Sequence, residues 1–398
     1  MISKRNLLYF LFVIPAVIIF SFYAGLIPVR QFPTLENPKK IILNCEFQGQ
    51  ELVIEETLYQ SVRDYYRNDP KKKGYSTRNE YQYFITEAEE DKTLKKITGK
   101  IKEKAIMLDL NSDRTLDLAT CFVQNIPYDE AKAKKVLSTE KQFFSSADFE
   151  EMQGRFPYET LYDNQGICTD KSFLEAALAR ELGFGVSLLT FDLERHMAAG
   201  VKVPIEYSSF NTGYALVETT NTGYRVGQLP IIDDNRGQVR DPSIVKATDE
   251  FIPEIIQSNL SKPSQVITVS EGKSYDRIVY LSQIEKKLSE IIIELNAQNY
   301  QLEILKNELI NQEEVVDNKR EELILEKERL KEKELQYQIN PTQENYQIYS
   351  NYYNQYSSLF YNFKALSDSY NLKVDFYNQK IVTFNANIDE YNNLIKID

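Results

Sequence analysis

Residues 164–172 read Asn-Gln-Gly-Ile-Cys-Thr-Asp-Lys-Ser, and the interpretation of the chain starts from this segment. Gly166 permits a tight turn. From Thr169 onward apolar residues recur at helical spacing until Gly183, a residue type that commonly ends a helix. Cys168 therefore stands at the N-terminus of a predicted helix. The partial positive charge at that end favours a thiolate over a thiol, so the spacing indicates a nucleophilic cysteine.

A histidine and a carboxylate follow in the order that a thiol triad requires. His196 lies 28 residues after Cys168, beside a predicted strand at 197–203, and Glu218 lies 22 residues further, at the end of another at 215–218. If these two strands are antiparallel neighbours, Glu218 can hold the imidazole in the tautomer that accepts a proton from the thiol. Each residue type alone is usually structural. Together, in this order, they predict a catalytic triad.

Six segments around these residues carry a family resemblance. They are Leu118–Tyr128, Phe156–Leu161, Gly166–Ser172, Arg195–Val201, Val217–Thr220 and Val226–Pro230. In them the chain resembles the transglutaminase-like superfamily, whose fold is related to that of papain-like cysteine proteases, and more specifically its membrane-associated archaeal and bacterial members. The resemblance covers chiefly residues 90–235 and implies an α+β papain/transglutaminase-like core with Cys168 and His196 as catalytic residues. Glu218 stands where the family usually has Asp, and the resemblance implies the same orienting role.

Two groups are candidates for stabilising an oxyanion. The backbone N–H of Cys168 is the first, because it points out from the helix start, and the side chain of Gln165 is the second. Asp170 is expected to cap or orient the helix start rather than to act in catalysis. This chemistry implies no cofactor and no metal.

Composition argues against several classes of protein. The chain carries a net charge of −12 without a dense Lys/Arg stripe, which argues against nucleic acid as the main partner. With three cysteines and one histidine, a structural zinc, haem or iron–sulfur site is not expected. Calcium held by oxygen ligands stays open, although no EF-hand loop is present. Cys45 and Cys121 can pair if the domain lies outside the cytoplasm, or can pack as free buried thiols.

The N-terminal segment is predicted to span a membrane. Residues 7–29 carry no charge, and at ~1.5 Å per residue they can cross the ~30 Å hydrocarbon layer. Lys4 and Arg5 precede the run, so the positive-inside rule predicts a cytoplasmic tip and transmembrane helix at 1–29, with the bulk of the chain extracytoplasmic. The alternative is a cleaved signal peptide, for which the apolar run is long and lacks a clean cleavage site.

Proline content and the pattern of apolar residues divide the middle of the chain into three segments. Residues 30–44 are predicted to be a stiff linker because they contain two prolines. Residues 45–235 are predicted to form the transglutaminase-like domain, with helices first and short strands later. Residues 236–275 hold three prolines and little apolar sequence, and are predicted to be a second linker.

Residues 276–398 have the heptad pattern of a coiled coil. In the first arm one apolar residue recurs every seven positions from Leu281 to Tyr337, and Asn340-Pro341 then breaks the helix. In the second arm the seam is largely aromatic, from Tyr346 to Tyr391. Two arms of matching length predict an antiparallel hairpin with arms of about 85 Å. The aromatic residues are interpreted as core packing rather than as a docking surface. A homo-oligomer or a protein partner bound through the coiled coil is also expected.

The sequence therefore predicts a membrane-anchored thiol enzyme. Cys168 attacks an amide carbonyl, His196 acts as general base and then acid, and Glu218 orients it. Hydrolysis of a peptide or protein substrate (peptidase or amidase) is expected, because water needs no second binding site. Protein cross-linking by transamidation is one alternative. The other is a non-catalytic envelope binding or scaffold protein that recruits partners through its domain and coiled coil.

Overall fold

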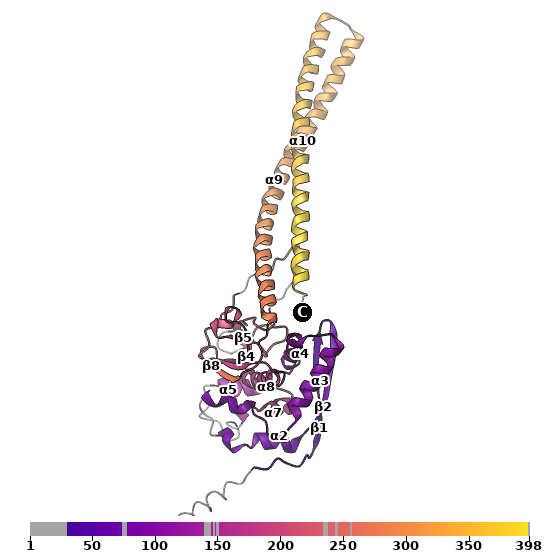
Figure 1. Ribbon diagram of the computed structural model, residues 1–398. Coiled ribbons are helices and arrows are strands. Elements are labelled where there is room, and N and C mark those ends of the chain that lie inside the picture. The colour runs from indigo at the N-terminus through magenta and orange to yellow at the C-terminus, as the bar shows by residue number, and fades with distance from the viewer. Residues whose placement is uncertain are drawn as a thin grey trace, which may run out of the picture. The chain divides into compact units, whose positions relative to one another are not determined.

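The computed structural model describes residues 30–396, except 74–77, 139–144, 146–147, 149–150, 234–237, 243–245 and 255–256. It forms two compact units (Figure 1). The first runs to Arg240 and includes Asn259–Asp276, and the second consists of Asp241–Ser258 and Arg277–Asp398. The predicted tip and transmembrane helix at 1–29 lie outside the described residues. None of the helices in the described part of the chain has the length and hydropathy of a membrane-spanning segment.

The first unit opens with a β-hairpin where the sequence predicted a linker. Strands β1 (Pro38–Phe47) and β2 (Gln50–Tyr59) pair antiparallel across a turn at Gln48-Gly49, whose two residues both have positive φ. In β1 every second residue from position 41 to 47 is buried. The prediction of a linker at 30–44 is therefore wrong from Pro38 onward. The alternation of apolar residues favours a strand there, and a proline is tolerated as the first residue of that strand.

A disulfide joins this hairpin to the helical part of the unit. Cys45 of β1 pairs with Cys121 of α4 (Ser112–Gln124), with Cα atoms 5.7 Å apart and a sequence separation of 76. The sequence left open whether these two cysteines pair. Cys168 is the remaining cysteine; it is free and buried.

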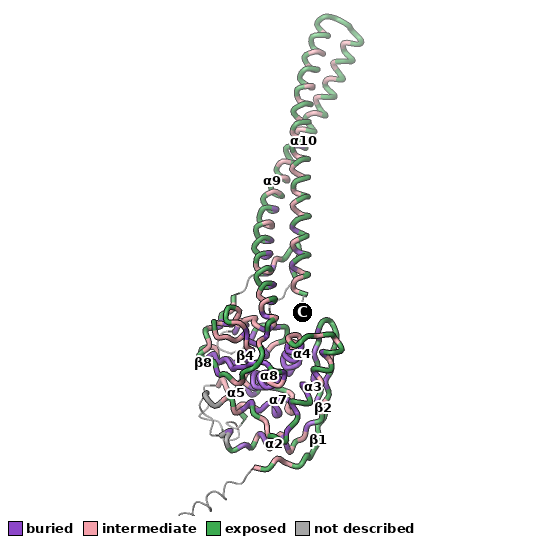
Figure 2. The backbone as a smooth tube through the Cα atoms, in the orientation of Figure 1, coloured by how far each residue is buried: buried purple, intermediate pink, exposed green. Residues whose placement is uncertain are grey.

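The helices of the first unit surround one buried helix. That helix is α8 (Cys168–Glu181), which is coloured as buried along nearly its whole length in Figure 2. The others are α2 (Gln60–Arg67), α3 (Thr93–Met107), α4, α5 (Glu130–Leu137) and α7 (Pro157–Asp163), with short 3₁₀ segments at Pro70–Lys73, Arg78–Ile85, Ile205–Tyr207 and Ser209–Asn211. A helix this buried needs apolar residues on all sides, and α8 has Phe, Leu and Ala on most of them.

The central sheet has four antiparallel strands in the order β5-β4-β3-β8. They are β3 (Val186–Phe191), β4 (His196–Lys202), β5 (Tyr214–Val217) and β8 (Gln265–Ser270). A two-stranded ladder joins β6 (Ile232–Asp233) to β7 (Gln238–Val239). The mixed α+β class is confirmed. The predicted linker at 236–275 is wrong in part, because the β-branched segment Gln265–Ser270 adds an edge strand to β3.

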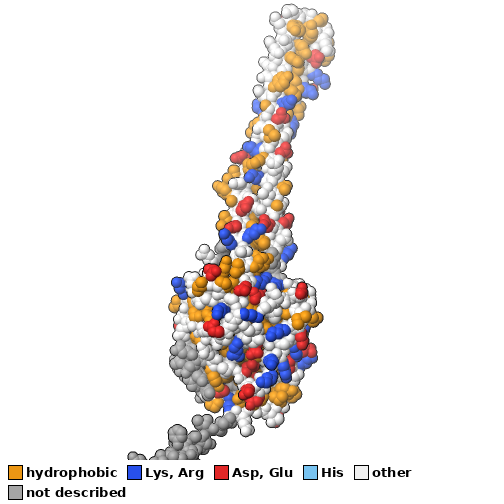
Figure 3. Space-filling model, viewed as in Figure 1, with side chains coloured by type: hydrophobic (Ala, Val, Ile, Leu, Met, Phe, Trp, Pro, Cys, Tyr) orange, Lys and Arg blue, Asp and Glu red, His pale blue; other side chains and the backbone are white. Residues whose placement is uncertain are grey.

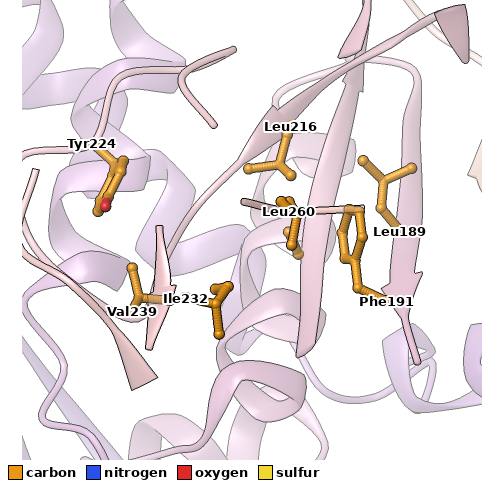
Figure 4. Close-up of a cluster of buried hydrophobic side chains, with 8 residues drawn as sticks. Leu189, Phe191, Leu216, Tyr224, Ile232, Val239 and Leu260 are labelled. Carbon is orange, nitrogen blue, oxygen red and sulfur yellow. The ribbon is translucent and has the colours of Figure 1, made fainter. Parts of the chain in front are cut away.

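The two faces of the sheet have different partners. Helix α8 packs against β3 and β4. Alternate residues of these strands, among them Leu189 and Phe191, instead join a cluster closed by residues of the following loops and of β6 and β7 (Figure 4). One face of β3 packs on α8 and the other packs in this cluster, so all six of its residues are buried.

The second unit is a hairpin of two long helices, α9 (Arg277–Ile339) and α10 (Gln343–Leu394), as predicted. Its cross-contacts run in opposite directions along the two arms: Lys287 pairs with Glu390, Glu308 with Lys373 at 3.0 Å, and Tyr337 stacks on Tyr349. The arms are therefore antiparallel. Thr342 caps α10 by accepting a hydrogen bond from the backbone of Asn345, just after the break at Asn340-Pro341.

Most of the buried residues of the hairpin lie at its base, where α9 begins and α10 ends; Val316 is a buried residue further along α9. Buried residues of both arms, including Leu295, Phe384 and Tyr391, pack together at the base with Ala247. Toward the turn, hydrophobic side chains lie at the surface (Figure 3), and Tyr353 is 51% exposed. The prediction that the aromatic residues form the seam is correct at the base, and Tyr346 still contacts Tyr337 of the other arm, with ring centroids 5.6 Å apart. Tyr353 and Phe360, further along the same series, are 51% and 41% exposed.

Removal of the disulfide is expected to destabilise the first unit. In the chain-entropy model, cross-linking across a 76-residue separation constrains the unfolded chain by about 4 kcal/mol. The double variant Cys45→Ser/Cys121→Ser should therefore lose about that much free energy of unfolding, measured by urea denaturation. Dithiothreitol should destabilise a Cys168→Ser control, which keeps the disulfide, and leave the double variant unchanged. Equal stability of the two proteins without reductant would contradict the expectation.

Candidate active site

Cys168, the candidate nucleophile, is the first residue of α8. Gly166 precedes it in a close passage of backbone: its N–H donates to the carbonyl of Pro127 at 3.1 Å, and its carbonyl accepts from Asp129 at 3.2 Å. A Cβ on Gly166 would lie 2.9 Å from the Cβ of Asp170. Only glycine fits here, which explains the glycine two residues before Cys168 and confirms the predicted helix start.

Asp170 caps this helix, as expected, and does so inside the protein. Its Oδ2 accepts from the N–H of Ile167 at 3.1 Å, and its Oδ1 accepts from the N–H of Arg155 at 2.8 Å. The ammonium of Lys132 lies 2.8 Å from both carboxylate oxygens. Asp170 and Lys132 are both buried, so each charge depends on the other for its stability.

The buried ion pair continues into a network behind α8. Arg155 binds Asp129 at 2.7 Å, Asp163 at 3.3 Å and the Asp170 carboxylate at 3.6 Å. The backbone of Lys132 in turn donates to Asp129 at 2.9 Å. The network ties α5 and the loop before α8 to one another, and so fixes the position of Cys168.

The histidine and the carboxylate meet where the sequence placed them. Strands β4 and β5 are antiparallel neighbours, and His196 Nε2 lies 2.7 Å from Glu218 Oε2. The other oxygen of Glu218 accepts hydrogen bonds from the backbone N–H and the hydroxyl of Thr220. Both residues of the pair are buried. His196 Nδ1 is buried and has no hydrogen-bonding partner among the described residues, so it remains for Cys168.

The pKa shifts of Cys168, His196 and Glu218 favour the charged form of each group. Burial alone raises the pKa of the Cys168 thiol, but the proton and positive charge of His196 outweigh it and the pKa lies below its ordinary value. Burial alone lowers the pKa of His196, but the Glu218 and Cys168 charges raise it to about 10. Burial also raises the pKa of Glu218, and His196 and Thr220 reverse this, so that it lies below its ordinary value. The three shifts all favour the charged forms: thiolate, imidazolium and carboxylate.

No hydrogen bond of ordinary length joins Nδ1 to the Cys168 sulfur in this conformation; the nearest hydroxyl to that sulfur is Thr169 Oγ1, at 4.0 Å. The thiol and the imidazole are nevertheless close enough for His196 to lower the pKa of Cys168 both by hydrogen bonding and by its charge. Catalytic hydrogen bonds are commonly long before substrate binds and shorten in the reacting complex.

An open cleft of about 750 Å³ lies beside His196. It is lined by Thr169, next to the nucleophile, and by His196, together with Tyr81, Val136, Leu137, Ser138, Thr190, Phe191, Asp192, Arg195 and Met197. Its volume lies within the range of small-molecule and peptide-binding clefts. A carbonyl group bound in this cleft would lie beside His196 and next to Thr169, the residue that follows Cys168.

Gln165, the second oxyanion candidate, is exposed. Its backbone carbonyl accepts a hydrogen bond from the Arg155 guanidinium at 3.1 Å. This geometry gives no support to Gln165 as an oxyanion donor. The backbone N–H of Cys168 at the start of α8 remains the first candidate.

Several residues of the site were not found from the sequence. Lys132 and Thr220 hold Asp170 and Glu218, and Gln124 donates to the carbonyls of Glu218 and Tyr224 at 2.8 Å. Tyr128 forms a backbone bridge with Gly166, and its pKa is raised by burial and by the charge of Cys168. Tyr128 and Gln124 lie in a segment that carried the family resemblance, which was the one available signal. Among the described residues, no group of His, Cys, Asp and Glu side chains is suited to hold a metal ion.

Comparison with known families agrees with this geometry. Residues 92–221 match the family model described as a transglutaminase-like domain. The matched region contains Cys168, His196 and Glu218, and leaves out the β1–β2 hairpin and the C-terminal helices. It does not distinguish membrane-associated members, so that finer resemblance stays a prediction. No curated protein and no solved structure matches the chain.

Replacement of Lys132 by Met should destabilise the first unit by about 3–5 kcal/mol, because it leaves the Asp170 carboxylate buried without its main cation. Urea denaturation measures this. The double variant Lys132→Met/Asp170→Asn removes both charges and should recover much of the loss. Lys134→Met, at an exposed position of the same helix, is the matched control and should change the stability by less than about 0.5 kcal/mol. A Lys132→Met variant as stable as this control would show that the buried pair does not hold the helix start.

Proposed function

Residues 92–221 form a transglutaminase-like domain, and from that premise we propose that the chain is a thiol enzyme that hydrolyses amide bonds of peptides or proteins through Cys168, His196 and Glu218. The observation that carries the proposal is the buried contact of 2.7 Å between His196 and Glu218 beside the free Cys168. A domain that only bound a ligand would have no need of this arrangement. Burial of a carboxylate and an imidazole costs free energy, and such buried titratable pairs are concentrated at catalytic sites.

The geometry supports the following sequence of steps. The Cys168 thiolate attacks the amide carbonyl, and the oxygen that becomes negative faces the backbone N–H groups at the start of α8. The imidazolium of His196 gives its proton to the departing amine as the C–N bond breaks, which leaves a thioester. His196, now neutral, takes a proton from water as the water attacks the thioester, and Cys168 leaves as a thiolate. Glu218 holds the ring throughout and stabilises its charged form.

Transamidation differs only in the last step, where an amine replaces water. Hydrolysis is favoured because water needs no second binding site.

The pH dependence of alkylation tests the activated thiol. Because the pKa of Cys168 is lowered, the rate of its reaction with iodoacetamide should already be near its plateau below the ~8.5 of a free cysteine. His196→Ala removes the charge that lowers this pKa and leaves burial, which raises it. The inflection should then move above ~8.5, and the rate at pH 7 should fall about tenfold or more. Since Cys45 and Cys121 are paired, Cys168 is the thiol that reacts. The same inflection in both proteins would refute the triad.

Turnover should follow the same groups. On a labelled protein substrate, Cys168→Ser and His196→Ala should abolish release of new amino termini, and Glu218→Gln should reduce it less. Incorporation of a fluorescent primary amine in place of hydrolysis would identify the cross-linking alternative. An alkylation profile of a normal thiol, together with no turnover, would favour the non-catalytic binding protein.

We further propose that the chain is anchored in a membrane by residues 1–29, with the catalytic unit outside the cytoplasm. The uncharged run after Lys4 and Arg5 supports the anchor and its orientation. The Cys45–Cys121 disulfide supports the same side, because such bonds persist in oxidising compartments. The exposed aromatic residues of α10 support a second proposal, that the hairpin binds another copy of itself or a protein partner.

Protease added to intact cells or spheroplasts should remove most of the chain, because the first unit and the hairpin are expected on the outer side. Cys45 and Cys121 should be oxidised in the same preparation when free thiols are blocked before lysis. A cytoplasmic marker protein serves as the control for leakage. Protection of the full chain until the cells are lysed would reverse the orientation.

A further inference from the structure

The cleft beside His196 has a cationic side chain on its rim. Arg195 immediately precedes His196, lines the cleft, and has φ of 52°, a left-handed conformation that is uncommon for a non-glycine residue. Its guanidinium donates to the carbonyl of Leu137 at 3.3 Å. Leu137 lines the same cleft, so this hydrogen bond holds the guanidinium beside it. Strained backbone at a ligand site is often retained because it directs a side chain.

Arg195 differs in its partners from three arginines of the same unit that form ion pairs. Arg67 and Arg155 bind carboxylates at 2.6 and 2.7 Å, and Arg63 binds one at 3.2 Å. Arg195 has no carboxylate partner among the residues that the structure describes. In a chain of net charge −12 acidic side chains are plentiful, so an arginine without one beside a catalytic histidine is informative.

The rest of the lining is suited to the stem of an acidic group. Val136, Leu137, Phe191 and Met197 supply apolar surface. Asp192, the acid among the lining residues, is already engaged by the chain itself. Thr190, also in the lining, has a buried hydroxyl without a hydrogen-bonding partner, so a polar ligand atom that reached it would remove an unfavourable free energy.

We propose that Arg195 selects substrates that carry a carboxylate close to the scissile amide, as in an acidic peptide segment. The carboxylate binds the planar guanidinium through two parallel N–H donors, and its stem lies on the apolar lining. This rests on the proposed function in one respect, that the cleft beside His196 is where substrate enters. Arg195 is in this account a specificity residue; it takes no part in proton transfer.

Two alkylating agents of nearly equal size test the charge selection directly on the full chain. Iodoacetate carries a carboxylate and iodoacetamide is its neutral counterpart, and both react with the Cys168 thiolate. Arg195→Gln should lower the ratio of the iodoacetate rate to the iodoacetamide rate by about fivefold or more, the range expected for loss of a charge-assisted hydrogen bond. Arg240→Gln removes the same charge from a residue outside the cleft lining and should leave the ratio within about twofold. The effect of Arg195→Gln should shrink in high salt.

An unchanged ratio in Arg195→Gln overturns the proposal. The iodoacetamide rate taken alone reports whether the thiol is activated, so failure of the proposed function is seen separately. If the iodoacetamide reaction is slow but the ratio of the iodoacetate rate to the iodoacetamide rate still depends on Arg195, the anion site is supported and the proposed thiol enzyme is contradicted.

Peptides distinguish the source of the carboxylate. Three blocked tripeptides at millimolar concentration are compared for protection of Cys168 from iodoacetamide: one with a central Glu and an amidated end, one with a central Gln and an amidated end, and one with Gln and a free carboxyl end. Protection by the Glu peptide assigns a side-chain carboxylate, and protection only by the free carboxyl end assigns a chain terminus. Equal protection by the neutral peptide, or protection that persists in Arg195→Gln, contradicts the proposal.

Discussion

The salt bridge between Lys132 and Asp170 fixes the start of α8, and with it the position of Cys168. Asp170 caps the first turn of α8, so that Cys168 stands where the helix dipole favours a thiolate. A carboxylate two residues from the nucleophile would by itself oppose that charge, and the Lys132 ammonium at 2.8 Å neutralises it. A buried ion pair is seldom a net source of stability, because both charges lose their water. Its effect here is geometric: it permits one arrangement of α5, the loop at Gly166 and α8.

The second buried pair, His196 with Glu218, uses the same physics for a different purpose. Glu218 is compensated by the imidazolium on one oxygen and by Thr220 on the other. Near it lies Lys171, whose ammonium binds the backbone carbonyls of Gln124 and Ile126 and whose pKa is lowered by burial to about 7. His196 and Thr220 are the groups that lower the pKa of Glu218, and the charge of Glu218 raises the pKa of His196. The positive charge that Glu218 stabilises on His196 in turn lowers the pKa of Cys168.

The sequence was sufficient for features that depend on local patterns. The helix start at Cys168, the order of Cys168, His196 and Glu218, and the break between the two long helices each leave a signature in residue type and spacing. The pairing of Lys132 with Asp170 leaves none, because 38 residues separate them and a lone lysine on a short helix is ordinarily exposed. The strands β1 and β8 were missed because prolines beside them outweighed the alternation of buried residues. The disulfide could be named only as an option, since pairing depends on which strand faces which helix.

In the proposed mechanism, the resting protein holds a thiolate and an imidazolium side by side. His196 is the single histidine of the chain, so its ring gives the only histidine signals in an NMR titration of selectively labelled protein. Its pKa should lie well above the ~6.5 of a free imidazole, toward 10, and should fall in Cys168→Ser, where the thiolate charge is gone. A ring that is neutral at pH 7, or a pKa that does not respond to Cys168→Ser, would contradict the claim.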